Sequence, residues 1–182
     1  MMEREIKLAF DGPHAARAAV HRSGAVPLRG RRLQADVLLD TDEGTLRSRR
    51  CALRVREEPE QSLVTYKGPM QAARMKLRQE IETTVKDASA VLRILDELGF
   101  RVSFRYEKYR EEFQLPDAIV AVDETPIGTF VELEGTEAGI DAAARALGRG
   151  PADYVVDSYR TLYELHCQQL GVAAADMVFN RS

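Results

Sequence analysis

The chain has 182 residues, of which 45% are hydrophobic, so it is long and apolar enough to bury the core of one ordinary domain. Its 26 basic and 29 acidic residues give a net charge of -3, which provides no general attraction to nucleic acid or to an anionic membrane. No apolar run is long enough for a membrane helix, and the acidic first residues are not typical of a signal peptide. We therefore expect a cytoplasmic protein that binds neither membranes nor nucleic acid.

Alternation of apolar and polar residues predicts about eight strands. In chain order they are 2–10, 34–40, 52–58, 62–68, 76–86, 103–114, 118–124 and 129–135. Helices are predicted over 13–21, 87–98 and 137–147, and a last one from about 157 to before Gly171. These elements predict a single α+β domain over 1–182, in which 171–182 form a C-terminal tail.

The polar segments outside these elements are interpreted as loops. Residues 47–50 and 68–74 are basic and long enough to be mobile, and one of them could cover an entrance. The arginines of 29–32, together with Arg47, Arg49 and Arg50, have no interleaved aromatic residues, which favours a solvated loop over a nucleic-acid site. In the tail, Val178 and Phe179 are apolar and could pack on a neighbouring molecule, which leaves a homodimer open.

Two common kinds of site are absent from the sequence. Cys51 and Cys167 lie far apart, which indicates free buried thiols and not a disulfide or a zinc site. The chain also has neither a P-loop nor a glycine-rich dinucleotide fingerprint. Any phosphate must therefore be held by another arrangement.

The strands place full charges on one face and apolar residues on the other. Residues two apart in a strand share a face, so Glu3, Glu5 and Lys7 point one way while Ile6 and Leu8 point the other. The same pattern recurs along the chain. Its acidic members are Glu3, Glu5, Glu80, Glu82, Asp123, Glu132 and Glu134, and its basic members are Lys7, Arg54, Arg56, Lys67, Arg78, Lys108 and Arg110.

One strand of this kind is most simply a half-buried strand with its polar face in water. The recurrence on every strand favours a closed barrel, which turns all charged faces toward one lumen and leaves the apolar outside to be covered by helices. Paired carboxylates repel one another by about 1 kcal/mol at contact in water, and by more in a cavity. Cross-strand cations or divalent metal ions could offset that repulsion.

Such a lumen has the chemistry for a metal-bound polyphosphate. Clustered carboxylates favour hard cations such as Mg²⁺ or Mn²⁺. Clustered Arg and Lys side chains suit phosphate oxygens, and Arg can bind them in a bidentate geometry. We therefore expect an enzyme of phosphoryl or nucleotidyl transfer.

The ordered motifs resemble the CYTH superfamily of triphosphate tunnel metalloenzymes from about residue 2 to 165. They are Glu3-x-Glu5-x-Lys7, Leu53-Arg54-x-Arg56, Thr65-Tyr66-Lys67-Gly68-Pro69, Arg78-x-Glu80-x-Glu82, Lys108-x-Arg110, Asp123 and Phe130-x-Glu132-x-Glu134-Gly135. Close relatives in that superfamily include class IV (CyaB-type) adenylyl cyclases, thiamine triphosphatases and inorganic triphosphatases. The sequence departs from the family pattern at Leu38 and Leu39, where aromatic residues are common, and at Asp157, where a basic residue is often found.

The resemblance implies an eight-stranded antiparallel β-barrel with helices outside and a role for each charged residue. The metal ligands would be Glu3, Glu5, Glu82, Asp123, Glu132 and Glu134. The triphosphate would be bound by Lys7, Arg54, Arg56, Lys67, Arg78, Lys108 and Arg110. We further expect Lys7 to orient or activate the nucleophile and Glu80 to help polarise it, although either could serve only in ion pairing.

The predicted reaction is metal-dependent hydrolysis of a triphosphate such as ATP, tripolyphosphate or thiamine triphosphate, because water is a less demanding nucleophile to position than a ribose hydroxyl. The first alternative is an adenylate cyclase that converts ATP into cyclic AMP and pyrophosphate. The second is a protein that binds polyphosphate or nucleotide without turning it over. The shared motifs stabilise the same polyphosphate charge and do not choose among these reactions.

Overall fold

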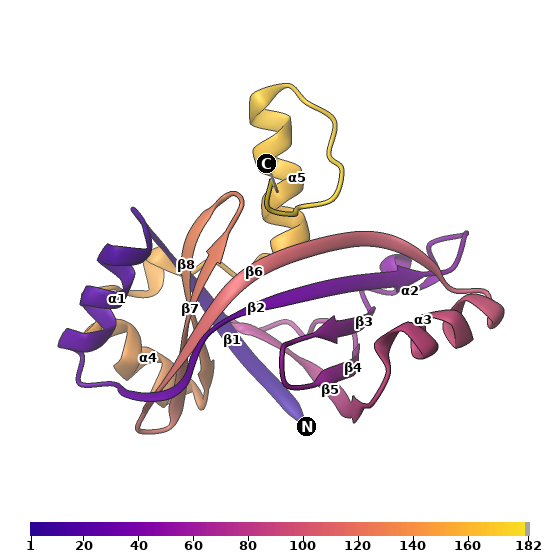
Figure 1. The fold of residues 1–182 in the computed structure, drawn as a ribbon. Coiled ribbons are helices and arrows are strands. Elements are labelled where there is room, and N and C mark those ends of the chain that lie inside the picture. The colour runs from indigo at the N-terminus through magenta and orange to yellow at the C-terminus, as the bar shows by residue number, and fades with distance from the viewer. Residues whose placement is uncertain (181–182) are drawn as a thin grey trace.

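A computed structural model describes residues 1–180, and its main element is an antiparallel sheet of eight strands that closes into a barrel (Figure 1). The strands are β1 (Met2–Phe10), β2 (Val26–Asp40), β3 (Ala52–Glu57), β4 (Ser62–Lys67), β5 (Lys76–Val85), β6 (Arg101–Leu115), β7 (Ala118–Thr125) and β8 (Gly128–Gly135). Around the ring their order is β1-β5-β4-β3-β2-β6-β7-β8, and β8 pairs again with β1. The predicted eight-stranded barrel is confirmed.

In the part of the chain that the structure describes, five α-helices lie outside the ring. They are α1 (Pro13–Arg22), α2 (Thr45–Ser48), α3 (Ala88–Glu97), α4 (Glu137–Ala146) and α5 (Tyr159–Leu170), and a 3-10 turn (Pro151–Asp153) precedes α5. Three of them start at side chains that accept a backbone N–H, namely Asp87, Thr136 and Ser158. In Figure 1, α1 and α4 lie together on one side, α3 lies at the opposite side, and α5 stands above β6 and β8.

The apolar core lies between the outside of the barrel and these helices. The largest cluster joins β1, β7 and β8 to α1 and α4, and it includes Ile6, Leu8, Val20, Val131 and Ile140, all 0% exposed. A second cluster packs α3 on β2 and β3 around Val55. Because alternate residues of β1, β3 and β8 enter these clusters, the intervening charged residues of these strands must point into the barrel.

Two strands begin two or more residues earlier than the sequence predicts. β2 begins at Val26 and β6 at Arg101, whereas the predicted strands begin at 34 and 103. Residues 29–32 therefore lie within β2, and the prediction of a solvated loop there was wrong. The register shifts between Pro27 and Arg29 and again before Arg32, and these irregularities interrupt the alternation from which strands are predicted.

The C-terminal tail packs on its own chain. Met177 is 0% exposed and forms a parallel bridge with Tyr106 of β6, and its N–H donates to the carbonyl oxygen of Arg105 at 2.9 Å. The ring of Phe179 lies 5.2 Å from that of Tyr109, centroid to centroid. Because Phe179 packs on its own chain, it gives no support to a homodimer, which stays a prediction.

Other expectations can be compared directly with the structure. Cys51 and Cys167 are buried and form no disulfide, as predicted. The short helix α2 was missed, since four residues carry too little periodic signal. Within residues 1–180, no helix combines the length and the apolar character that crossing a bilayer requires.

Candidate active site

The charged rows of the strands converge on one cavity inside the barrel, with a volume of about 900 Å³. Of the predicted site residues, all except Asp123 line it, and they come from six different strands. These residues are Glu3, Glu5, Lys7, Arg54, Arg56, Lys67, Arg78, Glu80, Glu82, Lys108, Arg110, Glu132 and Glu134. The structure therefore agrees with the expectation that the charged faces of the strands share one lumen.

Strand register brings the acidic residues together. On one side of β1, Glu3 is paired with Arg78 of β5; on the other side, Glu5 is paired with Glu134 and Lys7 with Glu132 of β8. Cα partners in neighbouring strands point to the same face, so these side chains share one wall of the lumen. We call Glu3, Glu5, Glu132 and Glu134 the acidic group.

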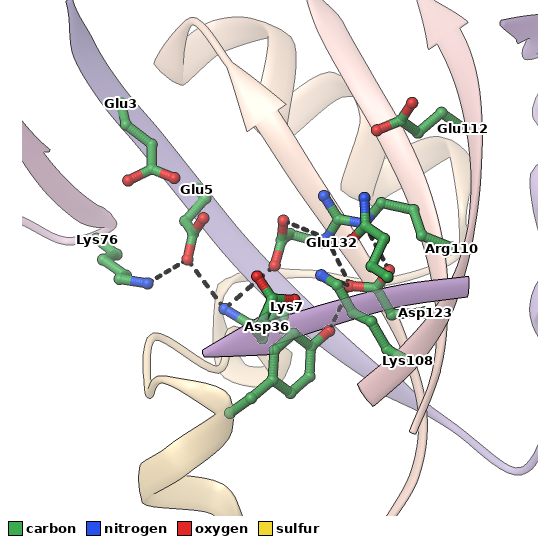
Figure 2. Close-up of polar contacts among 12 residues, drawn as sticks. Glu3, Glu5, Lys7, Asp36, Lys76, Lys108, Arg110, Glu112, Asp123 and Glu132 are labelled. Carbon is green, nitrogen blue, oxygen red and sulfur yellow. Dashed lines mark hydrogen bonds and ion pairs between the residues drawn. The ribbon is translucent and has the colours of Figure 1, made fainter. Parts of the chain in front are cut away.

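Three members of the acidic group have cationic partners. Glu3 accepts a hydrogen bond from Lys67 at 2.6 Å and one from Arg78 at 3.2 Å. Glu132 accepts from Arg110 at 2.6 Å. Glu5 accepts from Lys7 at 3.0 Å and also from Lys76 (Figure 2). These ion pairs reduce the repulsion within the group, as the sequence interpretation requires.

Glu134 is the exception, since within residues 1–180 its carboxylate has neither a hydrogen bond nor an ion pair. Burial and the neighbouring carboxylates Glu132, Glu3 and Glu5 together raise its pKa to about 7, against a smaller lowering effect of Lys67. Burial and Glu5 also raise the pKa of Glu3 to about 7. The negative charge of this group is thus incompletely compensated around Glu134.

The basic residues are held by carboxylates behind them. Asp36, 1% exposed, accepts from Arg56 at 2.8 Å and lies 3.4 Å from the Nε of Arg54. Burial opposes ionisation of Asp36, but the two guanidinium groups lower its pKa below the ordinary value. Asp36 therefore fixes the positions of both arginines at the cavity wall.

Asp123 plays a similar part on the other side of the lumen. It is fully buried, and its carboxylate accepts hydrogen bonds from Lys108 at 2.9 Å, from Arg110 at 2.7 and 2.6 Å, and from the Tyr159 hydroxyl at 2.6 Å. It does not line the cavity. This geometry favours an anchor for cations and does not favour the metal-ligand role predicted for Asp123.

The two predicted catalytic candidates lie in different surroundings. Lys7 is 1% exposed, and burial lowers its pKa less than Glu5 and Glu132 raise it, so its ammonium is a permanent donor and not a base. Glu80 lies 2.7 Å from Lys67 in an ion pair. Glu82 is the most open of the predicted acids, with a side chain 37% exposed, and it accepts from Thr65 at 2.6 Å.

A family model for the CYTH domain matches residues 1–159. The chain belongs to the CYTH domain family. A relative from Methanocaldococcus jannaschii is 29% identical over 148 residues, covering 81% of this chain and 84% of its own, and bears the name "Putative adenylate cyclase".

Two solved structures of the same fold are described by an activity. One, from Vibrio parahaemolyticus and described as a "putative adenylate cyclase", superposes with a TM-score of 0.77 at 21% identity, covering 89% of this chain and 97% of that one. The other, a cyclase-named protein from Hippeastrum described as having a dominant triphosphatase activity, has a TM-score of 0.64 at 19% identity, covering 94% and 97%. At these identities the likeness establishes the fold.

Several residues of this CYTH site were missed in the sequence. Lys76 and Asp36 follow the same alternation as the predicted residues and could have been included on that signal. Tyr159 was interpreted as core packing of the last helix, yet its ring lies 5.1 Å from the Lys7 ammonium and 4.9 Å from that of Lys108. At another part of the cavity, Glu58 binds Arg29 at 2.8 Å and Glu112 binds Arg32 at 2.8 Å.

The charges inside the barrel nearly cancel. The predicted set has as many carboxylates as cations, and the two buried additions, Asp36 and Lys76, bring one charge of each sign. A triphosphate carries several negative charges, so its entry into a nearly neutral interior would be opposed unless cations enter with it. The balance of charge in this CYTH chain therefore favours divalent ions that bind together with the triphosphate.

The acidic group also has the donor chemistry that such ions prefer. Carboxylate oxygens suit Mg²⁺ and Mn²⁺, and Glu134 presents one that no side chain in residues 1–180 neutralises. Within the same residues, no three acidic, histidine or cysteine side chains converge closely enough to form a ready-made metal site. The residues present therefore fit a divalent ion in chemistry, and side chains now held in ion pairs would have to reorient to ligate it.

Proposed function

We propose that this CYTH protein hydrolyses a triphosphate inside the barrel, with Mg²⁺ or Mn²⁺ bound by the acidic group. The observation that carries the proposal is the arrangement of the cavity, where fixed arginines and lysines on several strands face an undercompensated carboxylate on β8. Such an arrangement supplies charge neutralisation and positioning, which account for most of the barrier reduction in phosphoryl transfer. Candidate substrates are ATP, tripolyphosphate and thiamine triphosphate.

The basic residues would bind the phosphate oxygens. Arg54 and Arg56 are already oriented by Asp36, and Lys108 and Arg110 by Asp123, so the protein has little reorganisation to make when the anion enters. Tyr159 supports the Lys7 and Lys108 ammonium groups with its ring. Lys7, as a permanent donor, would orient the attacking water or stabilise charge on a phosphate oxygen.

Glu134 is the first metal ligand we assign, with Glu132, Glu3 and Glu5 completing the set. A divalent ion bound there would neutralise phosphate oxygens and favour loss of a proton from the attacking water. Glu80, held by Lys67, remains the candidate that polarises the nucleophile. Water attacks the terminal phosphorus, the bond to the bridging oxygen breaks, and orthophosphate and the remaining diphosphate leave.

Cyclisation of ATP is the second candidate function. The cavity volume of about 900 Å³ lies near the top of the range of ~300–1,000 Å³ typical of small-molecule sites, and the cavity extends past the phosphate-binding residues to Gln34, Glu58 and Glu112. The organic part of a nucleotide has room there. In that reaction the ribose 3′-hydroxyl would attack the α-phosphorus and pyrophosphate would leave.

Product analysis with ATP, tripolyphosphate and thiamine triphosphate tests the proposal, with Mn²⁺ or Mg²⁺ and with EDTA as the control. Orthophosphate that forms only with metal supports hydrolysis, whereas cyclic AMP with pyrophosphate supports the cyclase. Binding of the triphosphates without any product would identify a binding protein. Glu134→Gln should remove nearly all metal-dependent turnover while the protein stays folded, and near-normal activity of this variant would exclude Glu134 as a metal ligand.

A further inference from the structure

The ammonium of Lys76 lies beside the acidic group and, with that of Lys7, offsets the negative charge of Glu5. Lys76 is 4% exposed, and it is the register partner of Glu5 across the β1 and β5 pair. Its Nζ donates a hydrogen bond to Oε1 of Glu5, and the Nζ of Lys7 donates to the same oxygen at 3.0 Å. Figure 2 shows the two lysines reaching the Glu5 carboxylate from different sides.

Glu5 is placed between Lys76 and Glu134. On the β5 side its partner is Lys76, and on the β8 side its partner is Glu134, which has no cation of its own within residues 1–180. Lys76 also lines the cavity, so a bound anion could reach its ammonium. The same side chain can therefore meet either the Glu5 carboxylate or a phosphate oxygen.

We propose that Lys76 is a tethered counter-ion, which occupies the place of a divalent cation at Glu5 until a triphosphate binds. The proposal rests on the function proposed above and adds how that site is regulated. In the free protein, a metal ion that approaches Glu5 meets the Lys76 ammonium, and the repulsion weakens metal binding. When a triphosphate enters, the ammonium moves to a phosphate oxygen and leaves Glu5 free for the metal.

This exchange couples the two ligands. Each makes the site more favourable for the other, and by thermodynamic linkage the enhancement of affinity is the same in both directions. The protein would then take up metal together with triphosphate and leave few metal ions in the empty lumen. Arg110 and Arg56 are less suited to this exchange, because each donates two hydrogen bonds to a buried aspartate, Asp123 or Asp36.

The test is the variant Lys76→Met, with Lys86→Met as the matched control, because Lys86 follows the end of the same strand and is exposed. Two affinities are measured by titration calorimetry: that of Mn²⁺ for the free protein, and that of the non-hydrolysable analogue imidotriphosphate in EDTA. In Lys76→Met we expect Mn²⁺ to bind about ten-fold more tightly, because a nearby positive charge is gone, and imidotriphosphate to bind about ten-fold more weakly. Lys86→Met should match the wild type in both.

The opposite directions of these two changes distinguish a counter-ion from a purely structural lysine, whose loss would weaken both ligands or neither. Unchanged or weaker Mn²⁺ binding by folded Lys76→Met overturns the inference, and so does unchanged binding of imidotriphosphate. Lys76→Gln, which also lacks the charge, is held to the same criteria if the Met variant does not fold. A wild-type protein that binds neither ligand even when Mn²⁺ and imidotriphosphate are supplied together would instead overturn the proposed function and, with it, this inference.

Discussion

Glu5 and Glu134 are register partners on the adjacent strands β1 and β8, so their two carboxylates are direct neighbours on the same face of the sheet. Like charges in this position destabilise a sheet. Glu5 is neutralised by Lys7 and Lys76, whereas Glu134 has no such partner within residues 1–180. The strain of this pairing should appear in the pH dependence of stability.

The first prediction concerns the metal-free protein between pH 5 and 8. In the folded state the pKa values of Glu3 and Glu134 are about 7, above the ordinary value of 4.5, so between these values the folded state binds more protons than the unfolded state. The contribution of these two groups to the free energy of unfolding must therefore fall as pH rises through this window. Lys76 and Lys108, whose pKa values burial lowers to about 8, act in the opposite direction near its upper end. Because Glu134→Gln removes one of the two groups, it should reduce this fall by roughly half.

Urea denaturation in EDTA at several pH values measures the effect. Glu97→Gln, at an exposed position on α3, is the control and should follow the wild type. At pH 8 the Glu134→Gln protein should be the more stable one, and parallel curves for the variant and the wild type would show that Glu134 titrates normally.

A second prediction concerns the carboxylate that holds Arg54 and Arg56. The side chain of Asp36 is 0% exposed, so Asp36→Asn takes the counter-ion from the buried Arg56 and leaves Arg54 with Glu82 as its counter-ion, and it should cost about 3 kcal/mol of stability. Asp96→Asn breaks an ion pair with Arg101 whose aspartate is 64% exposed, and it should cost less than about 1 kcal/mol. Chemical denaturation compares the two, and equal losses would contradict the anchoring role of Asp36.

The third prediction concerns the triphosphate. Arg54→Ala removes a charged donor at the cavity wall, and imidotriphosphate binding measured by calorimetry should weaken about ten-fold or more. Arg93→Ala, on the exposed part of α3, should leave the affinity unchanged. Equal affinities of the two variants would remove Arg54 from the phosphate-binding set.

The fourth prediction tests the packing of the tail. Met177 is 0% exposed against β6 and α5, so Met177→Ala should lower the free energy of unfolding by about 3 kcal/mol. Its neighbour Val178 is 40% exposed, and Val178→Ala should change stability by less than about 1 kcal/mol. A thermal or urea denaturation series distinguishes them, and a minor loss for Met177→Ala would mean that the tail contributes little to the fold.

The barrel and its charged lumen could be predicted because alternation assigns a face to each residue before any partner is known. The roles of individual charges could not, since they depend on register. Lys76 and Lys7 both alternate correctly, but only the pairing of β1 with β5 brings Lys76 to Glu5. Tyr159 was beyond reach for another reason: an aromatic residue in a helix predicts core packing, and its contact with Asp123 depends on where α5 docks.

Arg29 and Arg32 lie in a part of β2 where apolar and polar residues do not alternate. Pro27, Gly30 and the register shifts around them break the alternation of β2, so a strand that is continuous in space looks like a loop in sequence. The ion pairs with Glu58 and Glu112 that follow from it were consequently invisible.

The closure of the barrel has a consequence for how the chain assembles during synthesis. β1 is made first, but its sheet partners are β5 and β8, and β8 ends only at Gly135. The N-terminal strand can pair with β5 once Val85 has emerged, but its other edge stays unpaired until β8 has left the ribosome, so ring closure is a late step dominated by long-range contacts. Until the barrel closes, the glutamates of β1 remain hydrated. The free energy of removing water from them is therefore spent when β1 and β8 pair.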